Sequence, residues 1–144
     1  MTTLETIKQG QNHWQEPVNK IVDAVNGLLG GVEPTHLDNP VEYLNGTTGA
    51  GTQAWVWQKG SVKLVVIALA LFKLAKDQSG QVIMRLPDNL KPVTEFQVPV
   101  NQDGLVTNGY SSDGPNTDIY YFNFTGSNVP TEQGDRRATL IYLA

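Results

Sequence analysis

The feature that most constrains the fold is a series of short apolar segments, separated by turn residues, over residues 54–144. The segments rich in β-branched and aromatic residues are 55–57, 81–86, 95–100, 105–107, 118–125 and 137–143. Glycine-containing turn sequences stand between several of them, at residues 59–60, 102–104 and 107–109. Short strands at this spacing predict a head domain over residues 54–144, built as an antiparallel β sandwich or barrel.

One segment, residues 61–74, is almost continuously apolar. Its first half is β-branched and favours a strand, whereas residues 68–75 are rich in good helix formers, so a long strand and a buried helix both remain open. Its uncharged part is about half of the ~20 residues that a membrane-spanning helix needs. The first residues lack the basic start and apolar run of a signal peptide, so we expect a soluble chain with no membrane insertion.

Residues 1–31 carry a heptad pattern of apolar side chains. The apolar a and d positions are Leu4, Ile7, Trp14, Val18, Ile21, Val25 and Leu28. Such a stripe fits either a helix that packs on its own domain or the seam of a coiled coil. Valine at a, Ile and Leu at d, and the polar Gln11 at one a position favour self-association as a dimer or trimer.

Pro17 interrupts this stripe, because proline removes a backbone donor and disfavours helix at the preceding residue. Either the helix kinks there, or Pro17 lies in the first turn of a shorter helix over residues 17–29. The pair Gly30-Gly31 is a typical helix stop. The next residues, 32–53, hold two prolines, Asn45-Gly46 and a glycine-rich run with no sustained period, which indicates a neck or linker.

Composition excludes several functions. The formal net charge is −4, and the sequence has no stripe of basic residues that could neutralise phosphates. A nucleic-acid partner is therefore not expected. There is no cysteine, and His13 and His36 have no metal-ligand spacing. No nucleophile elbow is present, and turn chemistry explains the oxygen-rich residues 101–118 better than a calcium loop does. We therefore expect no enzymatic activity, no cofactor and no metal.

Surface recognition remains, and exposed aromatic rings beside planar polar groups are the side chains that hold sugars. The candidate ligand-binding residues are Tyr110, Ser112, Asp113 and Asn116 in one loop, together with Trp55 and Trp57. Core packing is the alternative for the two tryptophans. In the alternating segment 118–125, we expect Phe122 and Phe124 to pack in the core or between chains.

Several short motifs follow one another in a familiar order. They are residues 57–62 leading into the long apolar segment, 80–87 with Pro92, 96–99, and 103–106. With the opening residues 4–25 as an anchoring helix, this layout resembles the receptor-binding or tail-fibre (baseplate) proteins of tailed phages that infect Gram-positive bacteria.

The resemblance implies a mainly β fold with an N-terminal helix, a neck and a C-terminal head that assembles as a homotrimer. It also implies a place in the virion, attachment to other baseplate or tail proteins through the N-terminal region, and binding of host cell-wall saccharides. It transfers no individual site residue. A structural baseplate adaptor or capsid-surface fibre is the alternative function, and a prophage-encoded envelope-degrading enzyme is a more distant one.

Overall fold

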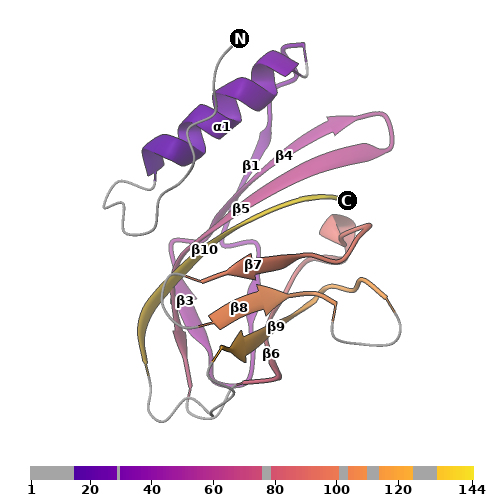
Figure 1. The fold of residues 1–144 in the computed structure, drawn as a ribbon. Coiled ribbons are helices and arrows are strands. Elements are labelled where there is room, and N and C mark those ends of the chain that lie inside the picture. The colour runs from indigo at the N-terminus through magenta and orange to yellow at the C-terminus, as the bar shows by residue number, and fades with distance from the viewer. Residues whose placement is uncertain (1–14, 29, 76–78, 101–103, 110–113, 125–132) are drawn as a thin grey trace.

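The computed structural model describes residues 15–28, 30–75, 79–100, 104–109, 114–124 and 133–144. A helix, α1 (Gln15–Leu28), precedes two antiparallel β-sheets (Figure 1). Sheet A has the order β1 (Thr35–Asp38), β4 (Gln53–Lys59), β5 (Val62–Leu74) and β10 (Gln133–Leu143), with β3 (Thr48–Ala50) also paired to β5. Sheet B has the order β2 (Glu42–Tyr43), β6 (Gln81–Arg85), β9 (Asp118–Asn123), β8 (Gly104–Thr107) and β7 (Gln97–Pro99).

The two sheets share one hydrophobic core, to which sheet A contributes Val56 and Ile67 and sheet B contributes Ile83 and Ile119. A single 3-10 turn, η1 (Asp88–Leu90), adds the buried Leu90 to the same core. Over the described residues each sheet ends in open edge strands and neither closes into a barrel. The predicted mainly β fold with an N-terminal helix is therefore confirmed, in its sandwich form.

Strand β5 decides the open choice for residues 61–74 in favour of a strand along its whole length. Val65, Ile67 and Leu69 belong to the core between the sheets. Val66 and Ala68 alternate with them and are also fully buried, on the opposite face of sheet A. A strand buried on both faces needs apolar residues at every position, and this is why the segment shows no alternation.

The segment 32–53 is not a neck, and this correction alters the domain boundaries. Strand β1 pairs with β4, β2 forms an edge of sheet B, and β3 pairs with β5. Val41 is part of the core. These strands have four, two and three residues, too few to show a period in the sequence. The Asn45-Gly46 turn is confirmed, with φ of 52° and 81°.

Tyr43 connects the two sheets. It stands on β2 of sheet B, and its hydroxyl lies 2.6 Å from the Thr52 hydroxyl, next to β4 of sheet A. Its ring lies against the backbone of Gly49 on β3, so closely that a Cβ at Gly49 would overlap it. Glycine is therefore required there for close approach, and the three residues fix one end of sheet B on sheet A.

Strand β9 presents the opposite face from the one expected. Ile119 and Tyr121 point into the core, so Tyr120 and Phe122 point outward. Phe124 follows the strand and is 64% exposed. The expectation that Phe122 and Phe124 pack in the core is therefore wrong, because alternation defines two faces but not which one is covered. Packing between chains stays a prediction for both.

Helix α1 contains Pro17 in its first turn, where the missing N–H has no intrahelical partner to lose. Gly30 and Gly31 follow it with φ of 68° and 82°, as the predicted helix stop requires. Within the described residues, no helix is long enough and apolar enough to cross a membrane.

The apolar stripe of α1 is partly buried. Val18 is 1% exposed, and Ile21 and Val25 are half-buried. Trp57 and Val66 are buried on the face of sheet A that turns away from the core. The burial of Val18 shows that part of the stripe is covered within the chain, and it does not decide between packing on the domain and self-association.

The rest of the predicted seam is not described. Leu4, Ile7 and Trp14 lie outside the described residues, and only the backbone of Leu28 is described. Self-association through this stripe therefore stays a prediction.

The contact between Tyr43 and Gly49 generates the first prediction. Gly49→Ala places a methyl group inside the tyrosine ring, so we expect the free energy of unfolding to fall by about 1–3 kcal/mol. Gly27→Ala is the control, because that helical glycine has open space around it and should gain up to about 1 kcal/mol. Chemical denaturation measures both, and equal stability of the two variants would contradict the contact.

The hydroxyl of Tyr142 generates the second prediction. Within the described structure this hydroxyl is buried without a hydrogen-bond partner. The Tyr142 ring that carries it stacks on Phe96, with the two ring centroids 5.5 Å apart. Tyr142→Phe should therefore keep or raise stability, by up to about 1 kcal/mol, whereas Tyr43→Phe loses the bond to Thr52 and should cost about 1 kcal/mol.

The same hydroxyl predicts how stability depends on pH. Burial raises the pKa of Tyr142 above that of an ordinary tyrosine. The unfolded chain then loses this proton first, near pH 10, so stability is full below that pH and falls as pH rises. The wild type should lose up to about 1.4 kcal/mol per pH unit more than Tyr142→Phe in this range. If the free energy of unfolding fell equally with rising pH in the two proteins, the burial of the hydroxyl would be contradicted.

Candidate functional site

The candidate site lies on the face of sheet B that turns away from the core. Because Ile119 and Tyr121 point inward, Asp118, Tyr120 and Phe122 point outward from β9. Their partners across the sheet are Arg85 and Val82 on β6 and Leu105 and Thr107 on β8, and of these Thr107 is buried. We call the other six residues of this group the sheet B outer face.

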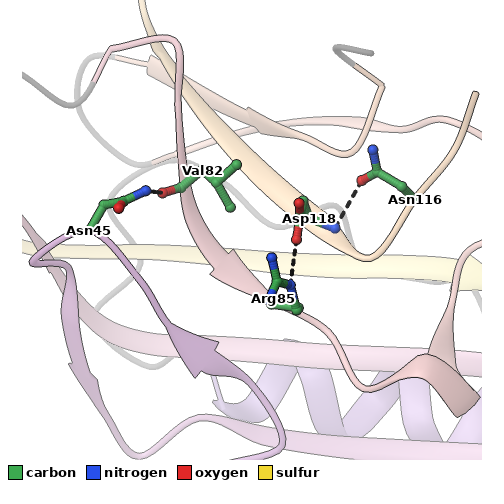
Figure 2. A network of polar contacts seen from close by, with 5 residues as sticks. All are labelled: Asn45, Val82, Arg85, Asn116 and Asp118. Atoms are coloured by element: carbon green, nitrogen blue, oxygen red, sulfur yellow. Dashed lines mark hydrogen bonds and ion pairs between the residues drawn. The ribbon is translucent and has the colours of Figure 1, made fainter. Parts of the chain in front are cut away.

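An ion pair stands at one end of the sheet B outer face. Arg85 Nε donates to Asp118 Oδ1 over 2.6 Å, and the two residues are direct Cα partners (Figure 2). The side chains are 49% and 27% exposed, so the pair lies at the surface. An exposed pair of this kind contributes little to stability, so its geometry matters more for what it presents to a ligand.

Asn116 fixes the start of β9. Its Oδ1 accepts a hydrogen bond of 2.8 Å from the backbone N–H of Asp118, two residues later, and Figure 2 shows the Asn116 amide nitrogen turned away from this bond. Asparagine favours this local turn because its side chain replaces a backbone acceptor. The Asp118 carboxylate is thus oriented from both sides, by Asn116 through the backbone and by Arg85 through the side chain.

Asn45 holds the neighbouring strand. Its Nδ2 donates to the Val82 carbonyl over 2.8 Å, and the backbone N–H of Leu44 donates to the Ile83 carbonyl over 2.9 Å. Asn45 adopts φ of 52°, a conformation that asparagine tolerates better than most residues. The turn after β2 is therefore attached to β6 close to Arg85, as Figure 2 shows.

Negative charge dominates around Arg85. The hydrogen bond and the charge of Asp118 raise the pKa of the Arg85 guanidinium above its ordinary value, and Glu42 and Asp88 add smaller effects in the same direction. Glu42 is the Cα partner of Arg85 on the other side, in β2. Three carboxylates thus act on the Arg85 guanidinium and one of them pairs with it directly, which makes this guanidinium a poor partner for an anion.

The cluster offers hydrogen-bonding capacity. The contacts that the structure gives Arg85 use its Nε, and those of Asn116 use its Oδ1. The terminal guanidinium nitrogens, the Asn116 amide nitrogen and the second Asp118 oxygen are left for a ligand in the described structure. No group of three His, Cys, Asp or Glu residues converges as a metal site within the described ranges.

The residues predicted from the sequence are only partly brought together here. Asn116 belongs to the cluster, whereas Tyr110, Ser112 and Asp113 lie outside the described residues.

The two tryptophans lie on the opposite sheet, A. Trp57 is 1% exposed. The prediction that it binds a ligand at the surface is therefore wrong, and its side chain packs inside the protein. Trp55 is partly exposed, with its ring 5.5 Å from that of His36.

Arg85 could not be identified from the sequence as a site residue. It is separated from Asp118 by 33 positions, and only the antiparallel pairing of β6 with β9 joins them. The available signal was the alternation of residues 118–124, which predicts a strand with two different faces. It does not show which face is outward, and so Tyr120 could not be separated from the core-facing Tyr121.

The arrangement defines a class: a two-sheet antiparallel β sandwich with an N-terminal helix. The receptor binding protein (gp15) of Listeria phage PSA has a similar fold in its crystal structure. The similarity covers 95% of this chain and 81% of that chain, with a TM-score of 0.57 and 15% sequence identity. The resemblance to phage receptor-binding proteins is thereby confirmed at the level of the fold. No protein-family model and no curated protein sequence matches the chain.

Proposed function

We propose that the chain is a virion adhesion subunit of a bacteriophage or prophage, which attaches the particle to its host through a cell-envelope saccharide. The observation that carries the proposal is the similarity of fold, over 95% of the chain, to a phage receptor binding protein. Fold alone does not determine function, so the surface must also supply a suitable binding group.

The surface chemistry supports a saccharide ligand. Sugars offer hydroxyl groups at fixed angles and an apolar ring face, and proteins hold them with planar polar groups and aromatic rings. The sheet B outer face carries Arg85 and Asp118 as planar polar groups and Tyr120 and Phe122 as partly exposed rings. These groups are also consistent with a role that needs no catalytic residue.

We further propose that the subunit works as a homotrimer whose N-terminal region binds other baseplate or tail proteins. Apolar side chains left exposed on sheet A support this. Ile141 and Leu143 on β10 are 46% and 47% exposed, and Val62 on β5 is 54% exposed. Exposed apolar residues gathered on one sheet are typical of surfaces that pair with another chain.

Cell binding tests the proposed function. The fluorescently labelled full chain should bind intact cells of a subset of Gram-positive strains, and wall polysaccharide released from a bound strain should compete. A labelled β-sandwich protein with no phage origin is the control. Binding to virion baseplate proteins but to none of the strains would contradict adhesion and favour the structural adaptor.

The mass in solution tests assembly. We expect three times 15.8 kDa by light scattering coupled to size exclusion. Ile21→Asp puts a charge on the half-buried apolar stripe of α1 and should weaken assembly by several kcal/mol while the sheets stay folded. Asn19→Asp adds the same charge at an exposed helix position and should leave the mass unchanged. A monomer across the micromolar range would contradict the trimer.

A further inference from the structure

We infer that the sheet B outer face is the saccharide site and that it takes a neutral sugar residue, with Tyr120 as the stacking ring and Arg85 and Asp118 as the hydrogen-bonding pair. This inference rests on the proposed function, which it deepens by naming the site and the chemical class of the ligand. It commits to one occupant, an uncharged pyranose carried on an envelope polymer.

Spacing along β9 places the two kinds of group at the right separation. Asp118 and Tyr120 are two residues apart on one strand, so their side chains leave the same face about 7 Å apart. That is the scale of one sugar ring. A pyranose lying on the Tyr120 ring therefore brings the hydroxyls at one of its edges to the Asp118 carboxylate.

The polar pair has donors and acceptors placed for neighbouring hydroxyls. Two adjacent hydroxyls of a sugar each donate and accept, and a guanidinium beside a carboxylate supplies both functions. Arg85 and Asp118 are already joined by a bond of 2.6 Å, which leaves the terminal guanidinium nitrogens and one carboxylate oxygen in the described structure. The Asn116 amide nitrogen adds a donor at the same edge.

Charge decides between a neutral and an anionic ligand. Glu42, the strand partner of Arg85 on β2, and Asp88 act on the Arg85 guanidinium together with Asp118. A phosphate-rich polymer would be repelled by this surface, because the one guanidinium is already neutralised by its partner. An uncharged sugar meets no such repulsion, and its hydroxyls can donate to the Asp118 carboxylate, which an anion without a hydroxyl cannot do.

The groups are held rigidly, which favours binding because less conformational freedom is lost. Tyr120 stands on β9, which has β6 on one side and β8 on the other. The strand that carries Arg85 is fixed by Asn45 through the Val82 carbonyl. Both elements also contribute core residues, Ile83 and Ile119, on their opposite face.

The test uses the full chain and wall polysaccharide purified from a strain that the wild type labels. Tyr120→Ala and Asp118→Asn should each weaken binding about tenfold, and Tyr120→Phe, which keeps the ring, should stay within about twofold. The matched control is Glu16→Gln, which breaks a comparable exposed pair with Lys20 on α1 and should leave binding unchanged. Tyr120→Ala changes a residue within a strand and can lower stability, so the melting temperature of each variant is measured. Asp118→Asn and Arg85→Met change exposed side chains instead, and they test the site if Tyr120→Ala does not fold.

The ligand class is tested with two further probes. Periodate, which oxidises neighbouring hydroxyl-bearing carbons to carbonyls and breaks the bond between them, should abolish binding to the polysaccharide, and unsubstituted polyglycerol phosphate should not compete. Competition by polyglycerol phosphate, or binding that survives periodate, would overturn the neutral sugar. Wild-type affinity in all of Tyr120→Ala, Asp118→Asn and Arg85→Met would overturn the site while the proposed function stands. A wild type that labels no strain would overturn both.

Discussion

The structure depends on a single strand that is buried on both faces and paired on both edges. Strand β5 has β10 along one edge, and β4 and then β3 along the other. Its central residues 65–69 are buried on both faces, whereas Val62 at its start is 54% exposed, and burying this central run removes apolar surface from water. Strands β3, β4 and β10 of sheet A pair directly with β5. Sheet B covers the core-facing side of β5 through residues such as Ile83 and Ile119.

A few polar contacts then set how sheet B lies on that base. The Tyr43 and Thr52 hydroxyls join the sheets at 2.6 Å, and Gly49 lets the tyrosine ring approach the backbone of sheet A. Two residues further along, Asn45 binds the carbonyl of Val82 on β6. The segment between the sheets thus positions the strand that carries Arg85, so the candidate site is linked to the core by short covalent and hydrogen-bonded steps.

The candidate site shows how a sandwich can carry recognition without disturbing its own stability. On β9, each core residue is followed by one that points outward, so the outward side chains can change while the packing stays the same. The exposed Arg85–Asp118 pair adds little to folding and leaves its remaining atoms for a ligand. This separation also explains why similarity of fold at 15% identity carries no information on individual binding residues.

The sequence by itself determined the class of fold, the turns at Gly60 and Asn45-Gly46, and the end of the helix at Gly30-Gly31, because these depend on local conformation and periodicity. Only the tertiary structure decided that residues 32–53 form strands of both sheets, since each strand is too short to be stable without its partner. The tertiary structure also decided that Tyr121 and not Tyr120 packs in the core, and that Arg85 pairs with Asp118. Burial and strand pairing are properties of distant segments brought together, and no local pattern contains them.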